Sequence, residues 1–155
     1  MNDSVLDTAT TTTPRSPDYT IYKPNSRGSG AAIRFGLNRQ KAAIFVDGAS
    51  QIGERQFDWE NKITMKWGLQ DIGTVLAVLQ GRTSQAKLFH QSEKANSAFE
   101  LTLQDDPDRA PYLLSMSRQQ SADKTLRKVV IPLSQGEAAI LEAALRLAVA
   151  PLVGW

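Results

Sequence analysis

The sequence repeats one hydrophobic pattern, in which several short strands are followed by an amphipathic helix. The first run covers residues 31–81 and the second covers residues 86–150. A chain of 155 residues is the size of one domain, so we expect both runs to share a single core. In such an arrangement the helices cover one side of the sheets, and broad sheet surfaces stay open to a partner.

The first run contains stretches in which apolar and polar side chains alternate, as in half-buried strands. The predicted strands are residues 31–38, 41–47, 55–60 and 62–67, and Asp47-Gly48 is interpreted as a turn. A helix follows, with its apolar side chains at helical spacing and Gly81 at its end. Gly73 lies inside this helix and suggests close packing against the sheet.

The second run repeats the plan with predicted strands at residues 86–90, 98–104, 111–118 and 126–133. Ser134 and Glu137 have the spacing of a capping box, which predicts the start of the second helix. Pro151 is expected to end that helix. The fold class is therefore α+β, with four strands and a helix occurring twice.

The N-terminal segment differs in composition from the rest of the chain. Residues 1–20 are rich in threonine and proline, and we expect them to form a disordered tail ahead of a single domain at residues 21–155. Residues 22–30 are interpreted as a basic, flexible lead-in to that domain. The formal net charge is +2, and because residues 1–20 are net acidic, the domain is mildly basic.

The composition excludes several classes of protein. There is no cysteine, so disulfides, zinc–thiolate sites and thiol catalysis are excluded. No apolar stretch is long enough to span a membrane. The N-terminal residues lack the pattern of a secretory signal and are too acidic for a typical organellar transit peptide, so we expect a cytoplasmic location.

No catalytic or metal-binding constellation is visible. His90 is the sole histidine, and a packing or hydrogen-bonding role is expected for it. The aspartates at residues 105–108 lack the ordered ligand pattern of a calcium loop and read as a turn. No phosphate-binding loop motif occurs. We therefore expect a protein that is not an enzyme and that has no cofactor or metal.

Basic and aromatic residues along the strands suggest a surface for single-stranded nucleic acid, because lysine and arginine pair with phosphates while aromatic rings stack on unpaired bases. Arg55, Phe57 and Trp59 fall on one face of a predicted strand, where they form either a stacking platform or part of the core. Trp67 could join them, although the core is favoured for it. The candidate nucleic-acid-binding residues are Lys23, Arg27, Arg34, Lys41, Arg55, Phe57, Trp59, Lys62 and Lys66.

Several motifs, in order and at similar spacing, resemble the Whirly family of single-stranded DNA-binding proteins from about residue 21 to the end. Residues 52–60 (IGERQFDWE) resemble the family's I/V-G-E-R-K-Y-D-W-E, and residues 71–76 (DIGTVL) resemble E-V-G-S-L-I. Residues 87–90 (KLFH) are similar to E-F-F-H-D, and residues 112–117 (YLLSMS) to Y-F-V-S-L-S. Residues 130–140 resemble V-P-V-T-x-A-E-F-A-V, and residues 150–155 (APLVGW) resemble L-P-H-I-M-G-W.

The chain also departs from the family pattern. The family's first strand carries K-G-K-A-A-L after a tyrosine, whereas here residues 24–30 look like an insertion before Gly30-Ala31-Ala32, so the second motif lysine is missing or displaced. In the family this motif is tied to DNA binding and to assembly beyond a tetramer. The departures look like those of a bacterial or phage relative.

The resemblance implies two antiparallel four-stranded sheets braced by two helices. It also implies a homotetramer whose helices form the centre, with single strands lying along the sheets between subunits. The expected function is largely sequence-independent binding of single-stranded DNA in DNA protection, repair, recombination or transcription regulation. Two alternatives stay open: an RNA-binding or annealing factor of the same architecture, and a structural oligomer whose sheets bind protein.

Overall fold

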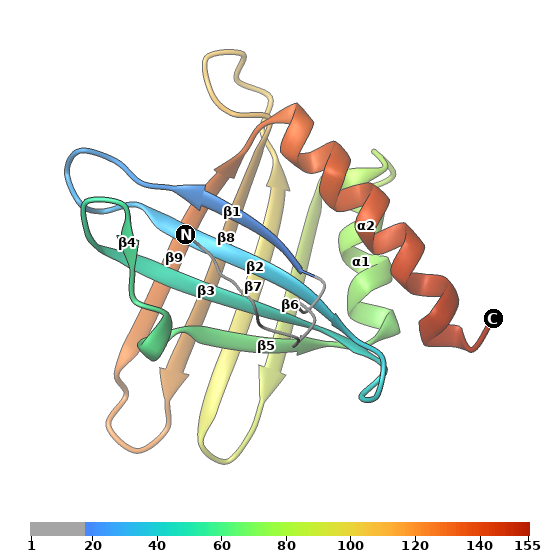
Figure 1. The fold of residues 1–155 in the computed structure, drawn as a ribbon, viewed down its shortest axis with the longest axis horizontal. Coiled ribbons are helices and arrows are strands. Elements are labelled where there is room, and N and C mark those ends of the chain that lie inside the picture. The colour runs from blue at the N-terminus through green and yellow to red at the C-terminus, as the bar shows by residue number, and fades with distance from the viewer. Residues whose placement is uncertain (1–17) are drawn as a thin grey trace, which may run out of the picture.

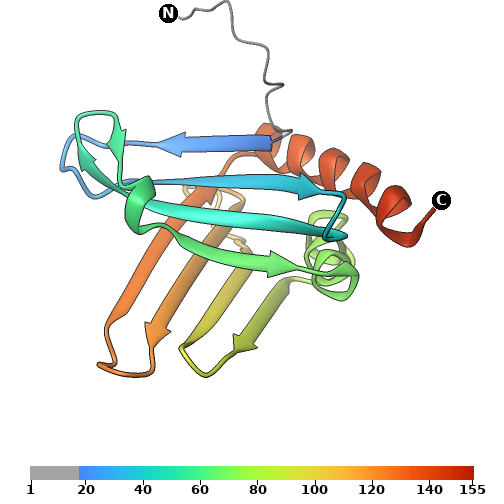
Figure 2. The same ribbon diagram turned by 60° about the horizontal axis from the view of Figure 1, so that its bottom comes forward.

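The computed structural model describes residues 18–155, which form two antiparallel β-sheets with two helices packed together at one end (Figure 1). The strands of one sheet run across those of the other, and the helices lie against the end opposite the β1–β2 loop (Figure 2). The first sheet contains β1 (Asp18–Lys23), β2 (Ala31–Asn38), β3 (Ala43–Gly53), the short β4 (Gln56–Phe57) and β5 (Ile63–Trp67). The second contains β6 (Gln85–Gln91), β7 (Ala95–Leu103), β8 (Tyr112–Gln120) and β9 (Leu126–Leu133).

The two helices each follow one sheet in the chain. Helix α1 (Leu69–Leu79) comes after β5, and helix α2 (Gln135–Val153) comes after β9, which confirms the α+β plan of strands followed by a helix. A 3₁₀ turn, η1 (Trp59–Asn61), connects β4 to β5. Among residues 18–155, no helix has the length and apolar content needed to cross a membrane.

One hydrophobic core lies between the sheets and under the helices. It is built from alternate residues of each strand, such as Ile33 and Phe35 of β2, and from one stripe of each helix. Trp67 is fully buried at its centre and packs edge-on against Phe99 of the second sheet, with ring centroids 4.7 Å apart. The interpretation of Trp67 as a core residue is therefore confirmed.

The two sheets come into close contact at Gly48, which lies inside β3 rather than in the predicted turn. A Cβ atom placed there would lie 2.8 Å from Cγ2 of Val129 and 3.2 Å from Sδ of Met116, both in the second sheet. The glycine therefore marks a backbone crossing, because no larger side chain fits between the two layers.

We expect Gly48→Ala to lower the free energy of unfolding by about 1–3 kcal/mol, because the methyl group overpacks the sheet crossing. Gly73→Ala is the matched control. Gly73 is exposed on α1, and nothing lies within 4 Å of the position that its Cβ atom would take, so the prediction that Gly73 packs closely against the sheet is wrong. In that open helical site alanine should stabilise by about 0.5–1 kcal/mol. Urea denaturation measures both, and equal effects of the two changes would contradict this account.

Other boundaries differ from the sequence prediction. Residues 18–20, assigned to the tail, lie in β1, while the rest of that segment lies outside the described residues. The fourth long strand of the first sheet is therefore β1, not residues 55–60, which contain only the two-residue β4 and the 3₁₀ turn. Pro151 lies within the last turn of α2, and Gly154, with φ +87°, ends the helix instead.

The start of α2 is tied to the first sheet by an ion pair. The predicted capping box is present, since the Glu137 backbone N–H donates to Ser134 Oγ and the Ser134 N–H donates to Glu137 Oε1. Lys23 Nζ of β1 lies 2.8 Å from Glu137 Oε1. Partial burial would raise the pKa of Glu137, but the hydrogen bonds from Lys23 and Ser134 outweigh it and hold the pKa below its ordinary value.

This depressed pKa predicts how stability depends on acid. A carboxyl group with a lower pKa in the folded state contributes stability above its unfolded pKa, and that contribution is lost as the pH falls through the folded value. We therefore expect Glu137→Gln to be less stable than the parent protein at neutral pH, with the two urea midpoints converging below about pH 4. A difference that persists unchanged at acidic pH would contradict this role.

Candidate nucleic-acid interface

The outer face of the first sheet, turned away from the core, gathers most of the candidate residues. Because side chains alternate along a strand, the burial of Ile33, Ile44 and Ile63 turns their sequence neighbours outward. The register then places outward residues side by side: Tyr22 beside Ala32, Arg34 beside Asp47, Asp47 beside Thr64, and Phe45 beside Lys66. This set, with β4 and η1 folded beside it, is called the outer face below.

At the centre of the outer face, Arg34 joins an acidic residue to an aromatic ring. Its Nη2 donates to Asp47 Oδ2 at 2.9 Å, and its guanidinium lies 4.5 Å from the ring centroid of Trp59. Asp47 also accepts a hydrogen bond of 2.7 Å from the Thr64 hydroxyl. The cluster fixes Trp59 on the sheet, and Arg127 of β9 supports the same turn by donating to the Asn61 carbonyl at 2.7 Å.

Two aromatic rings lie together beside this cluster. Tyr22 of β1 and Phe57 of β4 have ring centroids 5.6 Å apart and planes inclined at 45°. Tyr22 is 57% exposed, so part of its ring is open to stacking by a nucleobase. Phe57 is partly buried, and it belongs to the edge of the outer face rather than to the core.

At the other end of β3, one aromatic ring is flanked by two lysines. Phe45 lies opposite Lys66 in the register, and Lys41 Nζ is 5.8 Å from the Phe45 ring centroid. Both lysines are exposed, as is Lys62 just before β5. A base on Phe45 would therefore have cations on either side for its phosphates.

The lead-in segment is not the flexible arm expected from the sequence: residues 22 and 23 lie in β1, and residues 24–30 form an ordered loop. The buried amide of Gln51 accepts hydrogen bonds from the N–H groups of Asn25 and Gly30, at 3.0 and 2.9 Å, and donates to the carbonyls of Asn25 and Gly53. Arg27 lies exposed on this loop. Arg55 lies in the neighbouring β3–β4 turn with φ +59°, so it does not share a strand face with Phe57 and Trp59 as predicted.

Lys23 does not lie on the outer face. It follows Ile21 on the inward side of β1, where it pairs with Glu137. The structure thus brings together Arg34, Lys41, Phe57, Trp59, Lys62 and Lys66, leaves Arg27 and Arg55 on loops beyond them, and turns Lys23 away.

Sequence reasoning missed Tyr22, Phe45, Asp47 and Thr64 as members of this face. Phe45 reads as one residue of an apolar run, and only the strand register shows that it points outward. The lone His90 forms a hydrogen bond as expected, with Nε2 3.1 Å from Asp71 Oδ2. Within residues 18–155 no three acidic or histidine side chains are placed to hold a metal ion.

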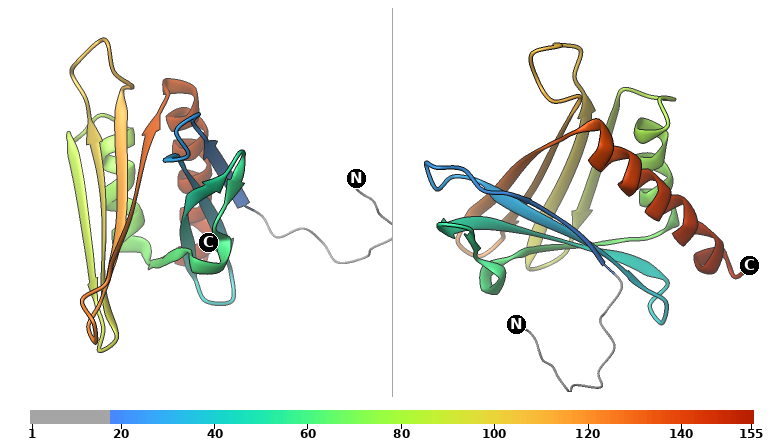
Figure 3. Two further views of the ribbon diagram at one scale, coloured as in Figure 1. Left: turned by 90° about the vertical axis from the view of Figure 1, so that its left-hand side faces the viewer. Right: turned by 45° about the horizontal axis from the view of Figure 1, so that its top comes forward.

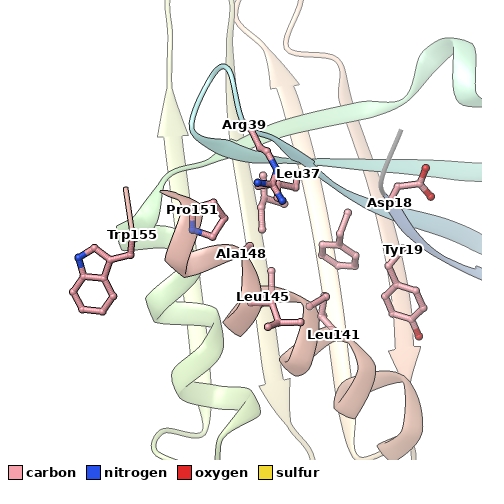
Figure 4. Close-up of a pocket in the computed structure, with 13 residues that line it drawn as sticks. Asp18, Tyr19, Leu37, Arg39, Leu141, Leu145, Ala148, Pro151 and Trp155 are labelled. Atoms are coloured by element: carbon pink, nitrogen blue, oxygen red, sulfur yellow. The ribbon is translucent and has the colours of Figure 1, made fainter. Parts of the chain in front are cut away.

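A second open surface lies where α2 meets the first sheet, at the end of the molecule away from β4 (Figure 1). A groove of about 550 Å³ runs between them, lined by Tyr19 and Leu37 on one side and Leu141 and Leu145 on the other (Figure 4). Leu147 is 74% exposed beside it. Trp155 is 96% exposed at the end of the chain, where Figure 4 shows it projecting away from the helix. Among the elements of residues 18–155, none covers the outward side of α2 in the views of Figure 3.

Comparisons of the sequence with known proteins find relatives over most of this chain. A family model described as "Whirly transcription factor" matches residues 8–144. The mitochondrial single-stranded DNA-binding protein WHY2 of Arabidopsis thaliana is 28% identical over 121 residues, covering 75% of this chain and 50% of that protein. The chloroplastic single-stranded DNA-binding protein WHY1 of Solanum tuberosum is 26% identical over 152 residues, covering 95% and 52%. The chain thus spans about half the length of these relatives.

Solved structures share the fold. The crystal structure of WHY1 from Arabidopsis thaliana superimposes with a TM-score of 0.74 at 20% identity, covering 94% of this chain and 89% of that one. A guide-RNA-binding protein complex bound to its RNA gives a TM-score of 0.65 at 16% identity, covering 91% and 94%. Both confirm the arrangement of two sheets and two helices.

Proposed function

Because the chain belongs to the Whirly family, we propose that it is a single-stranded DNA-binding protein that holds the strand along the outer face of its first sheet. The observation that supports this most directly is the composition of that face. It carries the rings of Tyr22, Phe45, Phe57 and Trp59 with the exposed cations of Lys41, Lys62 and Lys66. Rings that stack on unpaired bases and cations that pair with phosphates favour single strands of any sequence.

The proposed role is to protect or organise exposed strands in repair, recombination or transcription regulation, without catalysis. The relatives are named as DNA-binding proteins rather than as enzymes. They are named as mitochondrial or chloroplastic, whereas we propose a cytoplasmic location for this chain, because its acidic N-terminal residues do not resemble a typical organellar transit peptide. Fluorescence imaging of the tagged full chain in its own cells tests that location.

We further propose that the protein acts as a homotetramer built through its helices. The exposed apolar side chains of α2, among them Ile140 at 53% and Leu147 at 74%, form the kind of patch that soluble monomers seldom leave open. Burying them between copies would leave the outer faces of the first sheets pointing outward for the strand. Light scattering of the purified full chain measures the assembly.

A fluorescence-anisotropy titration of labelled single-stranded DNA at two salt concentrations tests the binding function. We expect nanomolar to micromolar affinity that weakens with salt, with a logarithmic slope of about 0.7 for each phosphate neutralised. Unlabelled duplex should compete poorly. Equal competition by duplex would contradict the proposal, stronger competition by RNA would favour the RNA-binding alternative, and no binding at low salt would favour a protein-binding sheet.

A further inference from the structure

An acidic residue lies at the centre of the surface proposed to bind a polyanion. Asp47 is 9% exposed, and its two carboxylate oxygens accept hydrogen bonds from Arg34 and Thr64. Both oxygens have partners supplied by neighbouring strands of the same sheet, β2 and β5. The negative charge is therefore held at a fixed place on the outer face.

The same contacts determine what Arg34 can do. Its Nε and Nη2 both donate to Asp47 Oδ2, at 3.3 and 2.9 Å, while its Cζ lies over the ring of Trp59, 4.5 Å from the ring centroid. A phosphate at Arg34 would have to displace this pairing and would approach the Asp47 carboxylate. Arg34 is thus neutralised within the protein, although its type and position suggest a phosphate ligand.

Within residues 18–155 the lysines of the outer face form no ion pair, and they lie away from the Asp47–Arg34 pair. Lys66 and Lys41 flank Phe45 toward one end of β3, and Lys62 precedes β5 at the border of the sheet. The Asp47–Arg34 pair is consequently neutral as a unit beside the Trp59 ring, and the lysine charges lie at its margin. A strand placed on this surface would turn its bases toward the centre and its phosphates toward the lysines.

We propose that the Asp47–Arg34 pair excludes phosphates from the centre of the outer face, which makes Asp47 a determinant of selectivity for single strands over duplex. A duplex presents phosphates outward and keeps its bases paired, so it meets the Asp47 charge without the compensation of stacking. This inference rests on the proposed function, since it concerns how the same face chooses its ligand.

The test compares salt dependence and duplex competition in three variants of the full chain, beside the parent protein. Asp47→Asn keeps the shape of the side chain but leaves the Arg34 charge without its partner. The slope of log affinity for single-stranded DNA against log salt concentration should then steepen by about 0.7, and duplex should compete about tenfold better. The charge-balanced double variant Arg34→Gln with Asp47→Asn should keep the parent slope. Lys66→Gln is the matched control, and its slope should become shallower by about 0.7.

Each result separates this inference from the proposed function. A parent protein that fails to bind single-stranded DNA overturns the proposed function before any variant is compared. If the double variant has a slope shallower by about 0.7, Arg34 contacts a phosphate and the inference is overturned. It is also overturned if Asp47→Asn leaves both slope and duplex competition unchanged. A thermal melting curve shows whether Asp47→Asn is folded. If it is not, the double variant decides alone, because it carries neither charge of the Asp47–Arg34 pair.

Discussion

Replacing Tyr22 by alanine should weaken binding of single-stranded DNA by about 5- to 150-fold, because stacking of one base on an aromatic ring is worth about 1–3 kcal/mol. Tyr22 is the most exposed ring of the outer face at 57%, and it contacts Phe57 at a centroid distance of 5.6 Å. Truncation therefore removes the ring without opening a cavity in the core, and stability should change little.

The matched variant for this change is Tyr22→Phe, which keeps the ring and removes only the hydroxyl. It should bind within about twofold of the parent protein if stacking is the contribution that matters. Anisotropy titrations at one salt concentration give both numbers. If alanine and phenylalanine weaken binding equally, the hydroxyl rather than the ring makes the contact, and the stacking account of this face is wrong.

Replacing Leu147 by glutamate should break the proposed tetramer. Binding of a long strand should then weaken by about 100-fold or more, because linked sites that contact one strand together gain about that much in overall affinity. Leu147 is 74% exposed on α2, so the charge costs little in an isolated chain. Between copies, however, it would bury unpaired negative charges. Light scattering should report a smaller assembly, and anisotropy the weaker binding.

Ser121→Glu is the control for the added charge. Ser121 is exposed in the β8–β9 turn, away from both helices, so this variant should keep the assembly and bind a long strand nearly as the parent does. A short oligonucleotide that reaches one subunit should bind Leu147→Glu and the parent protein alike. An unchanged assembly in Leu147→Glu would contradict the proposal that α2 forms the interface.

The elements that the sequence predicted well are those whose own pattern determines them. β2 alternates apolar and polar residues from Ile33 onward, and the Ser134–Glu137 capping box marks where α2 begins. β1 was not predicted, because Asp18 and its neighbours follow a threonine-rich segment and gain their strand structure from pairing with β2.

The errors around β3 have a physical cause in the packing of two layers. Asp47-Gly48 has the composition of a turn, yet the glycine is required where the sheets cross, and Asp47 finds partners on two neighbouring strands. A sequence window contains neither the second sheet nor the strand register. For the same reason the sequence alone does not show that the Lys23 side chain turns toward Glu137, since its direction depends on the geometry of β1.

Ultraviolet cross-linking of single-stranded DNA to the full chain, followed by mass spectrometry of the peptides, tests the central claim most directly. The account predicts cross-links on the outer face of the first sheet, at Tyr22, Phe45, Phe57 or Trp59, and their loss when unlabelled single strand competes. Cross-links confined to the groove beside α2, at Tyr19 or Trp155, would contradict it.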